Sequence, residues 1–238
     1  MLGSSVGMDK DVAKRLLRDE GIPVVPWTTV YDADWKNNSD KITENIVSTF
    51  GFPVFAKPAN AGSSVGVTRI TDAASLHDGI TNAFRFDVKV VIEPGIQCRE
   101  IECAVLGNRS PEASPLGEVA PVHEFYSYEA KYIDAEGAEL KIPAEMNKEL
   151  EEEIRAAAIR GYQVLQCSGL ARVDFFIDKE SNSFYLNEIN TLPGFTSISM
   201  YPKLWDYLGV AYSELLDRLL KLAFERFNER KNIYNVVN

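Results

Sequence analysis

Cysteine, histidine and basic residues are scarce in this chain, and each shortage argues against a class of protein. The three cysteines among 238 residues are too few and too scattered for a disulfide framework or a zinc site, so we interpret them as reduced thiols. The net charge of −10 disfavours a nucleic-acid partner, because binding to a phosphate backbone relies on clustered lysine and arginine. His77 and His123 are the only candidates for the general base of a serine hydrolase.

Long apolar runs are also missing. No stretch of about 18 apolar residues occurs in the sequence. The N-terminal MLGSSVGMDK does not place a charged segment before an apolar one, as a signal peptide does. We therefore expect no membrane span and a cytoplasmic location.

The sequence does contain enough apolar residues for a packed core, with 45% hydrophobic and 11% aromatic residues. Helical periodicity alternates with short extended segments, several of them joined by tight turns. This mixture predicts an α+β fold with antiparallel sheet rather than a doubly wound parallel sheet. The predicted helices are 9–20, 41–50, 72–85, 147–166 and 213–227; the predicted extended segments are 24–31, 53–58, 67–70, 88–93, 100–107, 170–178 and 183–190; and 108–146 is predicted to be irregular, with strand pieces at 116–120 and 141–145.

The pentapeptide GSSVG occurs twice, at 3–7 and at 62–66. One interpretation is a nucleophile elbow in which Ser5 or Ser64 attacks a carbonyl; the other is a glycine-rich loop that closes over phosphate. The elbow requires a turn from strand to helix, but the second copy leads into a predicted strand. Lys57 ends the strand before it, and a lysine beside a glycine-rich loop is typical of phosphate binding.

We therefore predict that loop 60–66 is a phosphate lid. The first GSSVG is interpreted as a chance repeat at a junction that enters a helix, with function in the nearby Lys10. Lys131 is a further candidate for phosphate contact, although a single lysine is more often a solvated surface group. The strand that ends in VVIEPGI places Glu93 beside a turn where a ribose or a base edge could bind.

Two carboxylates are expected to face each other in the hairpin made by LARVDFFID and SFYLNEIN. Alternation puts Arg172 and Asp174 on one face of the first strand, and Glu188 and Asn190 on one face of the second. If the turn is centred near Ser181, Asp174 lies about opposite Glu188. The carboxylates would then repel each other unless a cation lies between them.

Hard oxygen donors without histidine or cysteine suit Mg²⁺, which usually also binds substrate phosphates and water. The alternative interpretation is that these residues form the solvated polar face of a two-sided hairpin.

Several segments together resemble a known family. They are Lys57-Pro58, GSSVG at 62–66, VIEPGI at 91–96, EIECAVLG at 100–107, EAKY at 129–132, ARVDFF at 171–176 and NEINTLPGFTSISMYP at 187–202. With these motifs the chain resembles the ATP-grasp enzymes and, within them, the D-alanine–D-alanine ligase family. The resemblance covers nearly the whole chain, and its last two motifs are the most specific.

The resemblance implies a site for ATP and two magnesium ions, with Mn²⁺ as an alternative metal. The residues implied for the nucleotide are Lys10, Lys57 and Lys131 at the phosphates, Ser63 and Ser64 in the lid, Glu93 and Ile96 at the adenine, Glu100 at the ribose, and Phe175. The residues implied for the metal ions are Asp174, Glu188 and Asn190.

The resemblance also implies a site for D-alanine. Arg172 and the backbone N–H of Gly194 match stabilisers of an oxyanion, and Ser64 is included among the catalytic residues. Tyr132 matches a tyrosine that favours D-alanine over D-lactate as the second substrate. Ser199 and Met200 match the pocket for that substrate's carboxylate.

The implied fold consists of two α+β subdomains whose antiparallel sheets grip ATP. We expect residues 1–20 to form a junction and first helix, 21–98 the central subdomain, and 99–238 the C-terminal subdomain. The implied reaction joins two D-alanines through an acyl phosphate, for peptidoglycan precursors, in proteins that are dimeric at full length. The family has a further N-terminal domain that this sequence lacks. Two alternatives therefore stay open: a catalytically incomplete ATP-binding fragment, or a ligase for another amino acid.

Overall fold

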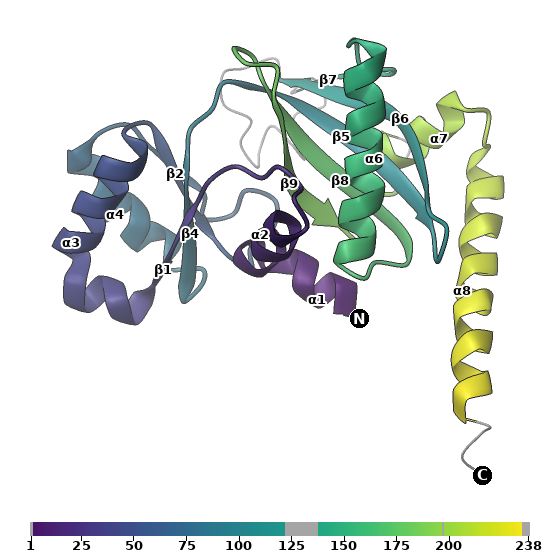
Figure 1. Cartoon of the computed structure of the whole chain (residues 1–238), viewed down its shortest axis with the longest axis horizontal. Coiled ribbons are helices and arrows are strands. Elements are labelled where there is room, and N and C mark those ends of the chain that lie inside the picture. The colour runs from purple at the N-terminus through teal and green to yellow at the C-terminus, as the bar shows by residue number, and fades with distance from the viewer. Residues whose placement is uncertain (1, 122–137, 197, 235–238) are drawn as a thin grey trace.

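The computed structural model describes residues 2–121, 138–196 and 198–234. Within these residues the strands form two antiparallel sheets, and helices pack on the faces of both (Figure 1). The predicted α+β class is confirmed, because neighbouring strands in both sheets run antiparallel.

The first sheet has the strand order β1-β4-β2-β3. Its elements are β1 (Thr28–Tyr31), β2 (Val54–Pro58), β3 (Thr68–Ile70) and β4 (Lys89–Pro94), with the helices α3 (Asp32–Phe50) and α4 (Ala73–Ala83). The two helices cover one face, where Val54 and Ala56 of β2 join their core. Because strand side chains alternate, Lys57 lies on the opposite face of the sheet.

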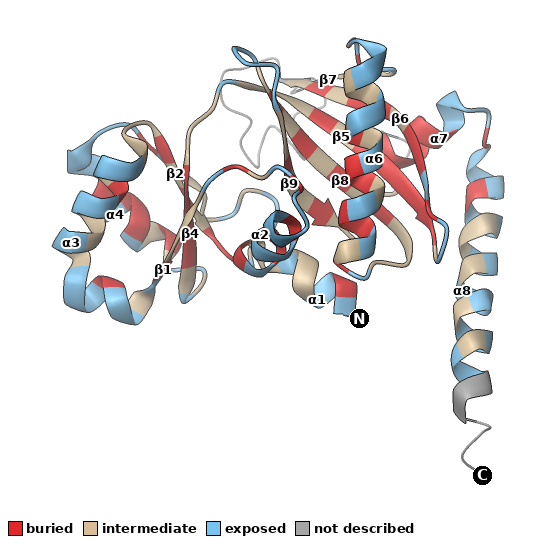
Figure 2. Cartoon of the chain, in the orientation of Figure 1, coloured by how far each residue is buried: buried red, intermediate tan, exposed pale blue. Residues whose placement is uncertain are grey.

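The second sheet has the order β7-β6-β5-β8-β9. Its strands are β5 (Cys98–Gly107), β6 (Glu112–Pro121), β7 (Ala138–Lys141), β8 (Gly169–Asp178) and β9 (Phe184–Asn190). Buried and half-buried residues alternate along β8, which appears as red and tan bands in Figure 2. Val173, Phe175 and Ile177 therefore belong to one face, and Arg172 and Asp174 to the other.

Helices cover both faces of this second sheet. α6 (Lys148–Val164) packs on the face of Val173 through Ile154, Ala158 and Tyr162, which recur at helical spacing. α7 (Met200–Tyr207) and the start of α8 (Tyr212–Tyr234) cover part of the opposite face, where they form a separate core with strand residues of β5. The rest of that face carries the polar residues of the predicted hairpin.

The first helices connect the two sheets. α1 (Leu2–Met8) contacts β9. α2 (Lys10–Asp19) is capped at its N-terminus by Asp9, whose carboxylate accepts the Val12 N–H at 3.1 Å. Leu17 of α2 joins the core under α6, whereas the Lys10 N–H donates to the carbonyl of Ala59 beside the first sheet. α2 is therefore a strut between the two sheets, as Figure 1 shows.

The first GSSVG was wrongly predicted to lie outside a helix, because it forms most of α1. The glycines of this segment allow close packing of the helix and do not form a phosphate-binding loop. A Cβ on Gly3 would lie 2.9 Å from the carbonyl oxygen of Gln166, and one on Gly7 would lie 3.1 Å from that of Ile189. The helix can approach the backbone of its neighbours only because those side chains are absent.

In the described part of 108–146, the predicted strand piece at 116–120 is confirmed within β6, whereas the piece at 141–145 overlaps β7 only at Lys141. β6 is a ten-residue strand, although its sequence EASPLGEVAP contains residues that disfavour strands. It forms because its backbone pairs with that of β5. The pairing shifts at a bulge near Ala104, and there the Ser114 hydroxyl accepts a hydrogen bond from the Ala104 N–H at 3.0 Å. α7 was not predicted, and α3 begins at Asp32 rather than near 41, with non-helical backbone angles at Asn38.

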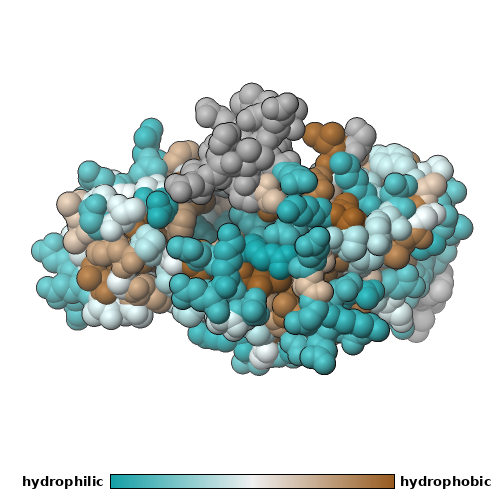
Figure 3. Space-filling model, turned by 90° about the horizontal axis from the view of Figure 1, so that it is seen from above, coloured by the Kyte–Doolittle hydropathy of each residue, from teal (hydrophilic) through white to brown (hydrophobic). Residues whose placement is uncertain are grey.

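Seen from above, most of the described surface is hydrophilic, with smaller apolar patches between (Figure 3). None of the helices in the described residues combines the length and the apolar character that crossing a membrane requires.

Candidate active site

The predicted hairpin has the predicted register. In the β8–β9 pair, Asp174 is the partner of Glu188, and Arg172 is the partner of Asn190. The ladder shifts immediately after Asp174, so a bulge marks the point where the polar residues meet. The prediction that these side chains converge is confirmed.

Hydrogen bonds join these residues, which we call the hairpin cluster: Arg172, Asp174, Glu188 and Asn190. The guanidinium of Arg172 donates from Nε and Nη2 to the two oxygens of Asp174, both at 2.7 Å. Asn190 Nδ2 donates to Asp174 at 2.9 Å and to Glu188 at 3.2 Å. The paired fork fixes the direction of the arginine.

Glu102 completes this cluster and was not predicted. It lies on β5 opposite Asp174, and its carboxylate is 3.1 Å from Arg172 Nε. Burial opposes the charged form of Arg172, but Asp174 and the other two carboxylates raise the pKa of its guanidinium above the ordinary value. The arginine is therefore a permanent positive charge. The alternation of Glu100 and Glu102 on one strand face was the available signal.

The two lysines predicted to bind phosphate, Lys57 of the first sheet and Lys10 of α2, lie near the hairpin cluster. Lys57 Nζ is 5.8 Å from the centre of the Phe176 ring on β8. Lys10 Nζ donates to the carbonyl of Ala61 at 2.6 Å. Burial and the charge of Lys57 lower the pKa of Lys10, while Glu188 raises it. The fold thus brings Lys10 and Lys57 together with the hairpin cluster.

Glu93 does not have the surroundings of an adenine contact, which corrects that expectation. Its side chain is 3% exposed and bridges Lys14 Nζ at 2.7 Å and Lys57 Nζ at 2.5 Å. Burial alone would raise the pKa of this carboxyl, but the two lysines lower it to about 2. Glu93 therefore holds the amines of Lys14 and Lys57 in place. Lys14 was not predicted, although it follows Lys10 by one helical turn.

Phe175 was also wrongly assigned to the nucleotide. It is 1% exposed in the core under α6, so its side chain has no access to a ligand. Phe176, the next residue, lies on the face of Arg172 and opposite Glu100. Glu100 therefore lies on the face of the hairpin cluster, and the half-buried Ile96 lies in the connection between the two sheets.

Loop 60–66 has the backbone of a tight turn. Ser63 and Ser64 have φ angles of 54° and 59°, and the Val65 and Val67 N–H groups donate to the carbonyls of Gly62 and Ser64. Two consecutive left-handed serines are costly, by about 1–3 kcal/mol each, and such conformations concentrate at functional sites. A role as a phosphate lid stays a prediction.

The structure places the two residues predicted for the second substrate's carboxylate, Ser199 and Met200, in different surroundings. Ser199 is the N-cap residue before α7 and lies beside Gly194, since a Cβ on Gly194 would be 2.9 Å from the Ser199 hydroxyl. The Ser199 hydroxyl also accepts the Thr196 N–H at 3.0 Å. Met200, by contrast, is 4% exposed in the core of α7 and α8, so its assignment to a substrate pocket is wrong for the side chain. Lys131 and Tyr132 lie outside the described residues.

The residues present fit a magnesium site that is completed by a ligand. In the described ranges, no group of three or more Asp, Glu, His or Cys residues is arranged to hold a metal alone. Asp174 and Glu188 provide two facing carboxylates, and Asn190 adds an amide. Mg²⁺ is commonly held by one or two carboxylates plus phosphates and water, so this donor set matches its habit.

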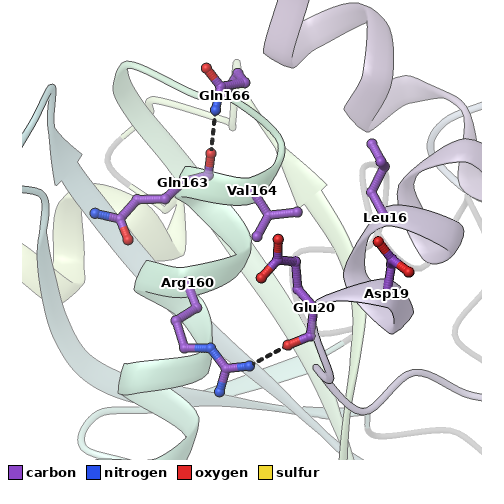
Figure 4. A pocket seen from close by; sticks show the side chains of 7 residues that line it. All are labelled: Leu16, Asp19, Glu20, Arg160, Gln163, Val164 and Gln166. Atoms are coloured by element: carbon purple, nitrogen blue, oxygen red, sulfur yellow. Dashed lines mark hydrogen bonds between the residues drawn. The ribbon is translucent and has the colours of Figure 1, made fainter.

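A cavity of about 420 Å³ lies elsewhere, between the C-terminal ends of α2 and α6 (Figure 4). Its lining residues are Leu16, Asp19, Glu20, Arg160, Gln163, Val164 and Gln166. The Arg160 guanidinium donates to the Glu20 carbonyl at 2.7 Å. The cavity is at the opposite end of α2 from Lys10, and we assign the chemistry to the hairpin cluster because the charged and converging groups are there.

Two antiparallel sheets, with lysines of the first beside an acidic hairpin of the second, define the class: the chain has the ATP-grasp fold. The protein-family model described as "D-ala D-ala ligase C-terminus" matches residues 16–221, and the chain belongs to that family.

Similar proteins and structures carry related names. The D-alanine--D-alanine ligase of Caldicellulosiruptor bescii is 50% identical over 98% of this chain and 64% of its own length. D-alanine--D-alanine ligase A of Escherichia coli strain K12 is 50% identical over 95% and 61%. The structure of the D-alanine-D-alanine ligase from Coxiella burnetii has a TM-score of 0.86 at 35% identity, over 99% of this chain and 62% of that one.

The VanG D-Ala:D-Ser ligase of Enterococcus faecalis has a TM-score of 0.82 at 35% identity, over 93% of this chain and 63% of that one. The chain thus spans about three fifths of the length of the relatives it matches.

Proposed function

We propose that this chain contributes the nucleotide and ligation site of a cytoplasmic enzyme that joins two D-alanines at the expense of ATP, for peptidoglycan precursors. The observation that carries the proposal is the β8–β9 register, which sets Asp174 against Glu188 with Arg172 beside them. The names of the similar proteins support the choice of substrate.

In the first step, the carboxylate of one D-alanine would attack the γ-phosphorus of ATP. An O–P bond forms, the bond to the bridging oxygen breaks, and ADP leaves. Lys10 and Lys57 would bind the phosphates, and their charges would offset the charge on the transferring group. A free carboxylate is a poor electrophile, because its negative charge repels the attacking amine. The acyl phosphate removes that charge from the acyl group and supplies the leaving group that the second step needs.

Asp174, Glu188 and Asn190 would hold magnesium, with Mn²⁺ as an alternative. When bound, the ion supplies charge neutralisation at the phosphoryl oxygens.

In the second step, the amine of the second D-alanine would attack the acyl carbon. The C–N bond forms, the C–O bond to phosphate breaks, and the departing phosphate takes up the proton that the amine loses. Arg172 and the Gly194 N–H would stabilise the tetrahedral oxyanion, at about 3 kcal/mol per donor. The lid of Ser63 and Ser64 would exclude water, which otherwise hydrolyses the acyl phosphate.

The test is phosphate release from MgATP by this chain, with and without D-alanine. We expect release that depends on D-alanine, and a dipeptide product. In the Glu188→Ala variant the Mg²⁺-dependent turnover should disappear; turnover equal to that of the unsubstituted chain would contradict the metal assignment.

A second candidate function is nucleotide binding without turnover. The observation that favours it is that the groups converging in the described residues, Lys10, Lys57, Asp174 and Glu188, are those proposed for the nucleotide and its metal ion. It predicts MgATP binding with no phosphate release under any substrate.

A third candidate is ligation of another amino acid, which the structural likeness to a D-Ala:D-Ser ligase favours. Replacing the second substrate by D-serine or D-lactate in the same assay separates it from the first candidate.

A further inference from the structure

A fully buried lysine lies behind the predicted phosphate site. Lys14 of α2 has 1% relative exposure, and its amine lies 5.5 Å from the centre of the Trp27 ring. It donates to the carbonyl of Val25 at 3.0 Å and forms an ion pair with Glu93 at 2.7 Å. Burying an ammonium group is expensive unless it is paired, so its partner is informative.

That partner is shared. Glu93 also binds Lys57, whose side chain is 14% exposed and is directed to Phe176 on the second sheet. We call Lys14, Glu93 and Lys57 the Lys–Glu–Lys triad. With both lysines protonated, the triad has two positive charges and one negative charge, and only the end at Lys57 is open to a ligand.

We infer that Lys14 is a positioning residue for phosphate recognition: it balances the charge of Glu93, so that the charge of Lys57 stays available to the anionic tail of a nucleotide. This inference rests on the proposed function and deepens it. If Glu93 paired with Lys57 alone, the pair would be neutral. Glu93 would hold Lys57 in place and cancel its charge at the same time.

A purely structural role for Lys14 makes a different prediction. In that case the ion pair only ties α2 to β4, and nucleotide affinity depends on whether the tie is intact. The two explanations separate when Glu93 is removed as well. The triad carries a net charge of +1 with Lys14 and Glu93 both present, 0 in Lys14→Met, and +1 again in the Lys14→Met, Glu93→Gln double variant.

The experiment is calorimetric titration of the full chain with ATP and with adenosine, in the presence of Mg²⁺. We expect Lys14→Met to weaken ATP binding about tenfold, which is the scale expected from removing one charge near the phosphates. Adenosine lacks phosphates, so its binding should not change. The double variant should recover most of the ATP affinity that Lys14→Met loses, because the net charge of the triad returns to +1 although Lys57 loses its ion pair with Glu93. Lys36→Met is the matched control, because Lys36 pairs with Asp32 on the exposed surface of α3.

The double variant also protects the test against misfolding, because replacing a buried ion pair by neutral groups of similar size is often tolerated. A folded double variant that binds ATP as poorly as Lys14→Met, or more poorly, would overturn the inference. So would unchanged ATP affinity in a folded Lys14→Met. An unsubstituted chain that does not bind ATP at all would overturn the proposed function itself, which is a distinct result.

Discussion

At the residue scale, the geometry of Arg172 gives a direct prediction about catalysis. Its guanidinium makes a paired fork with Asp174 and also contacts Glu102, so its direction depends on planar geometry as well as charge. Arg172→Lys keeps the charge but loses the fork. We expect kcat for D-alanine-dependent phosphate release to fall by about 10²-fold or more, with little change in the affinity for ATP.

A matched control exists on the opposite face of the same sheet. Arg99 makes a comparable fork with Glu118, at 3.0 and 2.6 Å, and its strand position alternates with that of Glu100. Arg99→Lys should leave kcat unchanged. Equal losses in the two variants would show that the effect of Arg172→Lys is one of stability rather than of the oxyanion.

Glu93 gives a residue-scale prediction about acid stability. Its pKa in the folded chain is about 2, below the ordinary value of 4.5. A lowered carboxyl pKa stabilises the fold fully above about pH 4.5, and this contribution is lost as the pH falls from about 4.5 towards 2. Glu93→Gln should therefore flatten the fall in the free energy of unfolding across that window.

The same substitution leaves Lys14 buried without its partner, so the free energy of unfolding at pH 7 should also fall, by about 3 kcal/mol. Urea unfolding at a series of pH values measures both effects. A variant whose acid dependence still matches the unsubstituted chain would contradict the account of Glu93.

At the scale of elements, loop 60–66 contains two glycines for which we expect opposite effects of substitution. A Cβ on Gly66 would lie 2.5 Å from Phe86 and 2.8 Å from the ring of Pro58, and its φ is +72°. A Cβ on Gly62 would meet nothing within 4 Å. We expect Gly66→Ala to lower the free energy of unfolding by about 1–3 kcal/mol and to weaken ATP binding, because the turn must distort.

Gly62→Ala is the control for this prediction and should change both quantities little. Urea unfolding and ATP titration of the two variants test the pair. A Gly66→Ala variant that behaves like Gly62→Ala would show that the turn is not required in this conformation.

The elements that could be predicted from sequence are those determined by short-range pattern. The β8–β9 hairpin was predicted with its register, because alternation fixes the faces and a short turn fixes the pairing. β6 and α7 were not, because they depend on distant partners. Gly117 of β6, for instance, leaves room for Met200 of α7, whose sulfur would be 2.5 Å from a Cβ there.

The site was predictable to the same extent. Residues in sequence motifs, such as Lys57 and Glu188, were found, and the structure brings them to one region. Glu102 and Lys14 were missed because their roles arise from the neighbours that tertiary structure gives them. Phe175 was assigned to the nucleotide, although alternation alone placed its side chain on the face of Val173, away from Asp174.

At the scale of the whole molecule, the proposed ligand would touch both sheets. Lys57 belongs to the first sheet and Glu188 to the second, and α2 joins them. A ligand that binds only the folded chain raises its stability, by about 2.7 kcal/mol at a concentration of 100 Kd. We therefore expect MgATP to raise the Tm of the chain, measured by differential scanning calorimetry.

The same measurement with the metal removed tests whether the rise in Tm depends on Mg²⁺. Adding EDTA in excess over Mg²⁺ should cancel most of the rise in Tm, because the carboxylates of Asp174 and Glu188 would then face the phosphates without a cation between them. The Tm without nucleotide is the control and should not respond to EDTA. A rise in Tm that survives EDTA in full would contradict a metal at the hairpin.

The two GSSVG segments have a consequence for how mutations in this chain are interpreted. They are the same five residues, yet one is a helix packed under the end of α6 and the other is an exposed turn. Ser4 in the first accepts a hydrogen bond from Thr191, whereas Ser63 and Ser64 in the second have left-handed backbone angles. The same substitution therefore has a different physical meaning in each copy: at 3–7 it tests the packing of a helix, and at 62–66 it tests the backbone of a turn.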